Sequence, residues 1–143
     1  WTREDDIRGG YYRPMYAHKM RGAIDADGKI IAWEQVIVGQ SIMGKADLDE
    51  TSVEGASNLP YVIPNLRVTA HNVQLAVPPL WWRSVGHTHT GFAVETFVDE
   101  LLQKVGKDPV EGRLALLTNE PRHMGTLKKV AEMANWGSKV PSQ

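Results

Sequence analysis

The sequence predicts an α+β fold, in which an antiparallel sheet of about three or four strands carries helices packed on one face. Two observations predict the sheet: residues 15–39 alternate apolar and polar side chains around an Asp-Gly turn, and a further apolar run follows Pro64. A third observation predicts the helices, because apolar residues between positions 90 and 134 recur at three- and four-residue steps. Strands followed by helices favour separate layers, and we expect residues 1–143 to form a single domain.

Residues 1–13 precede the predicted sheet and are mostly polar and charged. They include the acidic run Glu4-Asp5-Asp6. Consecutive carboxylates more often form a solvated face than a metal or acid–base cluster, so we expect a structural role for this run.

The predicted β-hairpin extends from Met15 to Gly39. Asp25-Ala26-Asp27-Gly28 supplies its turn, because Asp-Gly tolerates the positive φ angles that a tight reversal demands. One face of the first strand carries Tyr16, His18, Met20 and Ile24. The position of His18 within this alternation favours a sheet residue over a metal ligand.

Residues 40–60 predict a long irregular connection, and loops of this length in a compact domain are usually functional or mobile. The next informative segment is Tyr61-Val62-Ile63-Pro64-Asn65-Leu66-Arg67, which precedes a further predicted strand. Because Pro64 cannot continue a central strand, a third strand is expected from Leu66 to about Val77, where Pro78-Pro79 ends it.

The first predicted helix begins near Thr90 or Gly91 and ends at Gly106, which can adopt a left-handed conformation without steric cost. Its side chains at helical spacing predict one apolar face that needs a core to lie on. The members of this face are Val94, Phe97, Val98, Leu101, Leu102 and Val105.

Two further helices are marked by their ends. Asp108 is the predicted N-cap of the second helix, with Pro109 as its first residue and Glu111 as the reciprocal capping-box partner. The third helix is expected to start at Pro121 and to stop at Gly137.

Composition excludes several classes of function. The 16 basic and 17 acidic residues give a net charge of -1, which is no electrostatic footprint for nucleic acid. The absence of cysteine excludes a cysteine nucleophile, a cysteine-ligated zinc site and an iron–sulfur cluster within this chain. No run approaches the roughly 18 apolar residues of a membrane span. The chain starts at Trp1 rather than methionine, so we expect it to be part of a longer protein.

His87-Thr88-His89 is the most prominent candidate for a metal site. In a strand both imidazoles would point to the same side, but a stable site needs a third or fourth ligand. No histidine or carboxylate lies at a supporting short spacing. We therefore expect no metal site, and instead packing within a loop or hydrogen bonding to a cofactor.

Arg83 lies beside Trp81 and Trp82 in a glycine-containing turn at the predicted helix start. The residues alone leave two roles open. Arg83 is either a structural cation stacked on an aromatic ring or a fixed guanidinium aimed at an anionic ligand.

Two stretches of the chain together carry a family resemblance. Tyr61–Arg67 has the form Y-x-I-P-N-x-R, and Arg83–Arg113 combines a turn similar to R-G-x-G-x-P-Q with a helix that ends in G-x-D-P-x-E-x-R. The matching residues of the second stretch are Arg83, Gly86, Phe92, Glu95, Asp99, Gly106, Asp108, Pro109, Glu111 and Arg113. These stretches resemble the molybdenum hydroxylases, the xanthine dehydrogenase and aldehyde oxidoreductase family. The turn is most similar to the large subunit of the isoquinoline 1-oxidoreductase branch.

The resemblance implies site residues for this chain. Trp82, Arg83, Val85 and Gly86 match the turn that binds the cofactor in the family. Val85 stands where many relatives place an aromatic residue that stacks on substrate, so the resemblance implies that Val85 lines a differently shaped substrate pocket. Glu54 either faces the substrate or is a solvated loop glutamate, and composition favours the solvated glutamate.

Several positions depart from the family pattern. Thr88 and His89 stand where proline and glutamine are usual, which weakens any carry-over of function at these two positions. Residues 52–54 lie where purine-oxidising relatives carry an arginine, so N-heteroaromatic rings or aldehydes are expected as substrates rather than purines. The family's catalytic base is a glutamate in a glycine-rich motif that this chain lacks, so no catalytic residue is expected here.

The resemblance also implies what the complete protein contains. It would be an oxidoreductase that binds molybdenum with molybdopterin, in the cytosine dinucleotide form, and inserts a water-derived oxygen into a heteroaromatic or aldehyde substrate. The implied partners are the rest of the large subunit and a small subunit with iron–sulfur clusters, with neither nucleic acid nor a membrane segment in this piece. The related enzymes are bacterial, and both the cytoplasm and the periplasm are consistent with this sequence as the location of the protein. The alternative is a stand-alone, non-enzymatic α+β binding or assembly domain.

Overall fold

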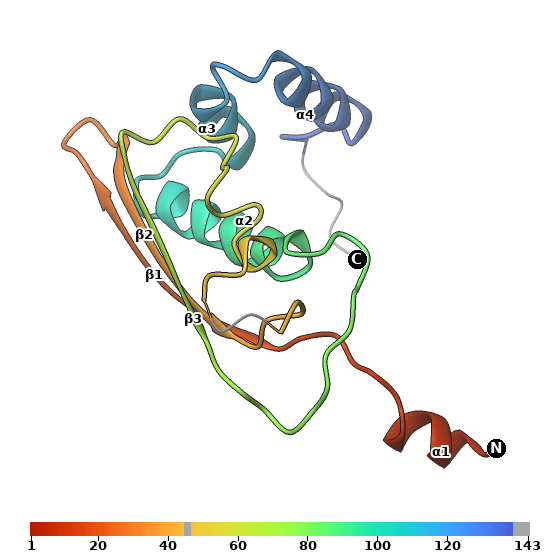
Figure 1. Cartoon of the computed structure of the whole chain (residues 1–143). Coiled ribbons are helices and arrows are strands. Elements are labelled where there is room, and N and C mark those ends of the chain that lie inside the picture. The colour runs from red at the N-terminus through yellow and green to blue at the C-terminus, as the bar shows by residue number, and fades with distance from the viewer. Residues whose placement is uncertain (45–46, 139–143) are drawn as a thin grey trace.

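The computed structural model describes residues 1–44 and 47–138 of the chain. Its elements are α1 (Arg3–Arg8), β1 (Tyr16–Ile24), β2 (Ile30–Gly39), the 3-10 helix η1 (Glu50–Ser52), β3 (Asn65–Asn72), α2 (His87–Lys104), α3 (Pro109–Leu116) and α4 (Pro121–Met133). The three strands form one sheet, and α2, α3 and α4 lie on the same side of it, whereas α1 lies apart (Figure 1). The predicted α+β class is therefore confirmed. None of the described helices is both long and apolar enough to span a membrane.

β1 and β2 form the predicted antiparallel hairpin. Gly28 adopts a φ of 74° in the turn between them. Asp25 Oδ1 stabilises the turn by accepting hydrogen bonds from the backbone amides of Asp27 at 3.0 Å and Lys29 at 2.8 Å. The Asp-Gly signal in the sequence thus identified both the hairpin and its turn.

The third strand differs from the prediction in direction and length. β3 runs parallel to β2, from Asn65 to Asn72, so the sheet is mixed and the predicted antiparallel pairing applies to β1 and β2. The physical reason is the connection over residues 40–64, which is long enough to return the chain to the starting end of β2. β3 ends at Asn72 rather than near Val77, because Asn72 lies opposite Gly39, the last residue of β2.

The main core lies between the sheet and α2. Trp33 of β2 is 1% exposed and packs edge-to-face against Phe97 of α2, with ring centroids 4.9 Å apart. The other buried members of this core are Ile30, Tyr61, Val94, Val98, Leu101, Leu102 and Leu117. A second cluster of Ile37, Val53 and Ala56 attaches the segment after η1 to β2. The predicted apolar face of α2 therefore faces the core.

α2 begins at His87, three residues before the expected start at Thr90. Thr90 is fully buried, and its hydroxyl donates to the Glu54 carbonyl at 2.6 Å. This bond joins the first turn of α2 to the segment after η1, a contact that the local sequence pattern does not contain. At the other end, Gly106 follows the helix with a φ of 67°, as predicted.

Asp108 caps α3 as predicted. Its Oδ1 accepts hydrogen bonds from the backbone amides of Val110 at 2.8 Å and Glu111 at 3.0 Å. Glu111 contributes its amide to this cap, and the described hydrogen bonds include none to its carboxylate. Trp136, beyond the end of α4, donates its indole N–H to the other oxygen of Asp108 at 2.9 Å. One carboxylate therefore joins α3 to the segment after α4.

The acidic run near the N-terminus lies in α1, which has no buried residue. Thr2 and Asp5 form a capping box, in which the Thr2 amide donates to Asp5 Oδ2 at 2.8 Å and the Asp5 amide donates to the Thr2 hydroxyl at 3.3 Å. The helix itself was not predicted, because six residues are too few to show apolar periodicity.

Candidate functional site

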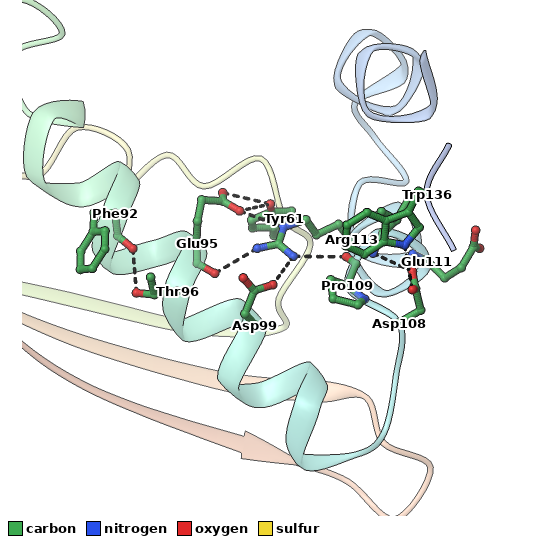
Figure 2. Close-up of polar contacts among 11 residues, drawn as sticks. Tyr61, Phe92, Glu95, Thr96, Asp99, Asp108, Pro109, Glu111, Arg113 and Trp136 are labelled. Atoms are coloured by element: carbon green, nitrogen blue, oxygen red, sulfur yellow. Dashed lines mark hydrogen bonds and ion pairs between the residues drawn. The ribbon is translucent and has the colours of Figure 1, made fainter. Parts of the chain in front are cut away.

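Four residues that carry the family resemblance, Tyr61, Glu95, Asp99 and Arg113, form one polar cluster that we call the brace (Figure 2). Arg113 of α3 donates from Nε to Glu95 at 2.9 Å and from Nη1 to Asp99 at 2.5 Å. Tyr61 donates its hydroxyl to the Glu95 carboxylate, 3.0 Å from each oxygen. The brace therefore joins α3 and the segment before β3 to α2.

The charges of the brace are paired within the chain. Burial opposes the charge of Arg113, whose side chain is 13% exposed, but hydrogen bonds to Asp99 and Glu95 prevail and raise its pKa above the usual range. Burial, together with the negative charge of Glu95, raises the pKa of Tyr61 to about 12. We interpret Glu95 and Asp99 as structural carboxylates rather than a catalytic pair, because Arg113 occupies both.

Residues 82–86, which we call the entry turn, lead the chain into α2 through a strained backbone. Ser84 and Val85 have φ angles of 73° and 45°, which cost a residue with a side chain about 1–2 kcal/mol each. Ser84 stands at the second position of the R-G-x-G pattern, where glycine would adopt this φ freely. Hydrogen bonds from the Val85 amide to the Trp82 carbonyl at 3.0 Å and from the His87 amide to the Ser84 carbonyl at 2.8 Å hold the turn.

Glu54 and Gly86, both predicted site residues, meet at the start of α2. The Gly86 amide donates to Glu54 Oε2 at 3.2 Å, and His87 Nδ1 lies 3.9 Å from the same oxygen. A Cβ atom at residue 86 would overlap the Thr51 carbonyl oxygen and lie 2.8 Å from Glu54 Cβ, so glycine permits this approach. Negative charge is favourable at a helix N-terminus, and Glu54 supplies it from within the chain.

Trp82, Arg83 and Ser84 are exposed in the entry turn, and Trp82 and Arg83 have the longest side chains among them. Trp82 is 55% exposed, and Arg83 is exposed as well. Within residues 1–44 and 47–138, the Arg83 guanidinium makes no hydrogen bond, ion pair or stacking contact with Trp81 or Trp82. Among the described residues, the stacked role for Arg83 is therefore not observed.

A chain of hydrogen bonds between buried and half-buried side chains, which we call the histidine relay, runs from β2 through β1 to the first turn of α2. Trp33 donates its indole N–H to Gln35 Oε1 at 3.3 Å, and Gln35 Nε2 lies 3.0 Å from His18 Nδ1. His18 Nε2 lies 3.0 Å from His89 Nδ1, and the Tyr16 ring stacks on the His89 ring at 3.8 Å. His89 Nε2 is buried without a hydrogen-bond partner among the described residues, which costs about 1–3 kcal/mol for a polar group.

Burial favours the neutral form of both histidines of the relay. Burial lowers the pKa of His18. Burial, followed by the charges of His18, Arg13 and His87, lowers the pKa of His89 to about 4. The described residues contain no group of three histidine, cysteine or acidic side chains that could hold a metal ion. The relay is therefore a network of neutral hydrogen bonds.

His18 was predicted as a sheet residue, but its contact with His89 was not predicted, because 71 positions separate the two histidines. One signal of the relay was present in the sequence. Gln35 is one of two polar residues in a mostly apolar strand, and it is fully buried in the structure. A buried amide needs hydrogen-bond partners, and these are the other members of the relay.

Comparison with known proteins first identifies a family. The sequence pattern of the family described as the molybdopterin cofactor-binding domain matches residues 1–116. This range extends from α1 to the end of α3. It therefore includes the brace, the entry turn and the histidine relay.

Individual relatives show the same similarity over nearly the whole chain. The chain is 27% identical over 146 residues to isoquinoline 1-oxidoreductase subunit beta of Brevundimonas diminuta, which covers 95% of this chain and 19% of that one. It is 28% identical over 165 residues to a membrane-bound aldehyde dehydrogenase (pyrroloquinoline-quinone) of Gluconacetobacter polyoxogenes, covering 95% of this chain and 21% of that one. This chain thus spans about a fifth of the length of these relatives.

One solved structure has the same fold. The aldehyde oxidoreductase from Desulfovibrio gigas superposes with a TM-score of 0.59 at 22% sequence identity. The match covers 90% of this chain and 16% of that one. At this identity the similarity supports the fold alone.

Proposed function

Because the chain belongs to the molybdopterin cofactor-binding domain family, we propose that its entry turn forms part of the cofactor cradle of a molybdenum hydroxylase-type oxidoreductase. Trp82, Arg83, Val85 and Gly86 contribute to this cradle. The observation that carries the proposal is the Arg83 cation, which is exposed without an ion-pair partner in the described part of the chain. The fold holds this cation on a strained backbone, and strain of this kind is concentrated at ligand sites.

The entry turn offers an anionic pterin cofactor the Arg83 side chain rather than the backbone amides of Val85 and Gly86. The Gly86 amide already donates to Glu54, and the Val85 amide already donates to the Trp82 carbonyl. The Arg83 guanidinium is available, and its planar donors match phosphate and other oxyanions. An anion would therefore be recognised by Arg83 and not by the N-terminus of α2.

On the substrate side, we propose that Val85 and Glu54 face the pocket. Bound molybdenum cofactor would supply the redox chemistry that adds a water-derived oxygen to an electron-poor carbon. Val85 offers an aliphatic wall, and Glu54 offers a carboxylate that is held by Gly86 while its side chain stays 40% exposed. N-heteroaromatic compounds and aldehydes are the proposed substrates, and the names of the two relatives, one for isoquinoline and one for aldehyde, support both classes.

The remaining parts of the proposed enzyme lie outside this chain. The catalytic base and the other cofactor contacts belong to the rest of the large subunit, and the iron–sulfur clusters belong to a partner subunit, since this chain has no cysteine. The cytosine dinucleotide form of the cofactor is proposed on the family resemblance alone. By itself the chain should neither retain molybdenum nor oxidise isoquinoline or an aldehyde, and a dye-linked assay of the purified chain checks this.

Cofactor analysis of the complete oxidoreductase tests the proposed function. Wild-type protein should contain molybdenum and pterin, and Arg83→Ala should bind the cofactor about thirtyfold more weakly, because losing a charged hydrogen bond to an anion costs about 2 kcal/mol. Arg122→Ala is the matched control, since Arg122 is exposed on α4 outside the family match. A quinone in place of molybdopterin would contradict the proposal. Protein without any cofactor would favour the non-enzymatic binding domain.

A further inference from the structure

Two segments of the chain expose large apolar side chains, and we call their combined exposed face the arm surface. One segment is residues 1–15, before β1, and the other is residues 73–81, between β3 and the entry turn. A patch of several large apolar side chains on a protein surface usually marks a contact with something else. The arm surface consists of Ile7, Tyr11, Met15, Leu75, Val77 and Leu80, all of which are exposed.

Backbone hydrogen bonds hold the two segments side by side. The Tyr12 amide donates to the Pro78 carbonyl at 3.0 Å, and the Leu80 amide donates to the Tyr12 carbonyl at 2.9 Å. The Tyr12 hydroxyl donates to the Ile7 carbonyl, which joins α1 to the same place. The arm surface is therefore formed by two segments that are fixed to each other.

A small hollow lies between the two segments. It has a volume of about 160 Å³ and is bordered by Met15 of the first segment and by Leu75 and Val77 of the second. Arg13 and Gln40 also border it, but the lining is mainly apolar. A cavity of about 150 Å³ can hold a group of the size of benzene. The hollow therefore has room for an apolar side chain of a partner.

α1 needs support that the described part of the chain does not give. It has six residues, none of which is buried, and it lies apart from the sheet and from the other helices (Figure 1). Helices shorter than about 12 residues are marginal in water unless they pack against something. We therefore expect α1 to be stabilised by a contact outside the described residues.

Charge and length indicate what makes this contact. Residues 73–81 contain no charged side chain, and residues 1–15 contain as many basic as acidic ones. A neutral, apolar surface suits protein rather than nucleic acid or an anionic membrane. Both segments lie within the family match. The alignment with isoquinoline 1-oxidoreductase subunit beta covers 95% of this chain but 19% of that one, so most of that relative lies outside the aligned region.

We propose that the arm surface docks onto the rest of the large subunit, with an apolar side chain of that part filling the hollow beside Val77. The inference rests on the proposed function, because it takes this chain as one part of a large subunit. Residues 73–81 lead directly into the entry turn. Docking at this surface therefore also fixes the position from which Arg83 reaches the cofactor.

Hydrogen exchange in the complete oxidoreductase tests the docking. The readouts are the exchange rates of backbone amides in α1 and in residues 73–81, with α2 as the reference for the core, and the molybdenum content of the same preparation. Val77→Asp places a charge on the arm surface. Val130→Asp is the matched control, because Val77 and Val130 are 58% and 56% exposed and Val130 lies on α4, outside the family match.

We expect the α1 amides of wild-type protein to exchange at least about a hundredfold more slowly than those of an unstructured segment. Val77→Asp should accelerate exchange in α1 and in residues 73–81 by about tenfold or more, because a charge is costly in an apolar interface. Exchange in α2 should stay the same. Val130→Asp should leave α1 and residues 73–81 at the wild-type rate.

Exchange of α1 at the unstructured rate, in protein with full molybdenum content, would overturn the docking and leave the proposed function standing. Equal effects of Val77→Asp and Val130→Asp on α1 would overturn it too. Protection that disappears on dilution would identify a second copy of the protein as the occupant, which also contradicts the proposal.

Two further outcomes have a defined meaning. Slow exchange of α1 in protein that lacks molybdenum and pterin would support the docking and contradict the proposed function alone. If Val77→Asp does not fold, Val77→Ala and Val130→Ala replace the pair, because alanine removes apolar contact without adding a charge. Val77→Ala should then accelerate α1 exchange by about threefold or more, and no difference between the alanine variants would overturn the docking.

Discussion

The brace and the entry turn each contain an arginine beside α2, but their polar groups are satisfied to different degrees. Arg113 of the brace is largely buried, and it meets Glu95 and Asp99. Arg83 of the entry turn is exposed and meets no carboxylate among the described residues. Both arginines match the same family pattern. The difference teaches that a shared motif contains some residues that are completed within the chain and stabilise the fold, and others that are not. We propose that the second kind binds a partner outside the chain.

The backbone shows the same contrast. The brace is carried by regular helices, and α3 has a satisfied N-cap at Asp108. The entry turn is carried by Ser84 and Val85 at positive φ. Neighbouring contacts such as the Gly86–Glu54 hydrogen bond hold this strained conformation in place.

Arg113→Ala should have the largest effect on stability. It leaves the carboxylates of Glu95 and Asp99 close together without their shared cation, and we expect the free energy of unfolding to fall by about 2–3 kcal/mol. Chemical denaturation measures this loss. Lys129→Ala is the matched control, because the Lys129–Glu132 pair is highly exposed and should contribute less than about 0.5 kcal/mol. Equal losses for the two variants would mean that the brace does not hold the helices together.

Gly86→Ala should have the next largest effect on stability. The added methyl group would overlap the Thr51 carbonyl oxygen, and we expect a loss of about 1–3 kcal/mol from overpacking. Gly91→Ala in the same helix is the control, since a Cβ atom there meets nothing within 4 Å. That change should stabilise the protein by about 0.5–1 kcal/mol through helix propensity. Thermal unfolding of both variants compares the signs, and two effects of the same sign would contradict the close approach at Gly86.

Ser84→Gly should have a smaller effect than these two changes, and it should increase stability. Glycine adopts a φ of 73° without the clash that serine has, so we expect about 1 kcal/mol of stabilisation. Ser84→Ala is the control at the same position, because alanine keeps the Cβ atom that causes the strain. Denaturation midpoints of the two variants should therefore move apart. A gain in the alanine variant would trace the effect to the serine hydroxyl and not to the backbone.

Asp108→Ala should have the smallest effect, and it should depend on pH. Hydrogen bonds from the Glu111 amide and then from Trp136 hold the pKa of Asp108 below its usual value. Because the pKa of Asp108 is lower in the folded state, its carboxylate stabilises the fold fully above the pKa of the unfolded state. This stabilisation is lost as the pH falls through the pKa of the folded state. We expect a midpoint lower than wild type by roughly 2–4 °C at pH 7. The two melting curves should converge in acid, and a constant difference would argue against a capping carboxylate.

The sequence alone predicted the elements whose causes are local. The Asp-Gly turn, the apolar face of α2 and the Asp108 cap each depend on neighbours within a few positions, and all three are present. The direction of β3 was not predictable, because it depends on where residues 40–64 travel.

The candidate site was predictable in part for the same reason. The resemblance placed Arg83 and Gly86 in the cofactor-binding turn, and Glu54 was a separate candidate for the substrate pocket. The structure brings Gly86 and Glu54 into contact. The histidine relay could not be predicted, since its members meet across two strands and a helix. The buried nitrogen of His89 becomes visible after those elements pack.

The most direct test of the contrast compares Arg83→Ala with Arg113→Ala in the complete oxidoreductase. Molybdenum content and the melting midpoint of cofactor-depleted protein are measured on the same preparations. Arg83→Ala should lose molybdenum and keep its midpoint, whereas Arg113→Ala should lower the midpoint and keep molybdenum in the protein that stays folded. Full molybdenum content together with a lowered midpoint in Arg83→Ala would contradict the assignment of the entry turn to the cofactor.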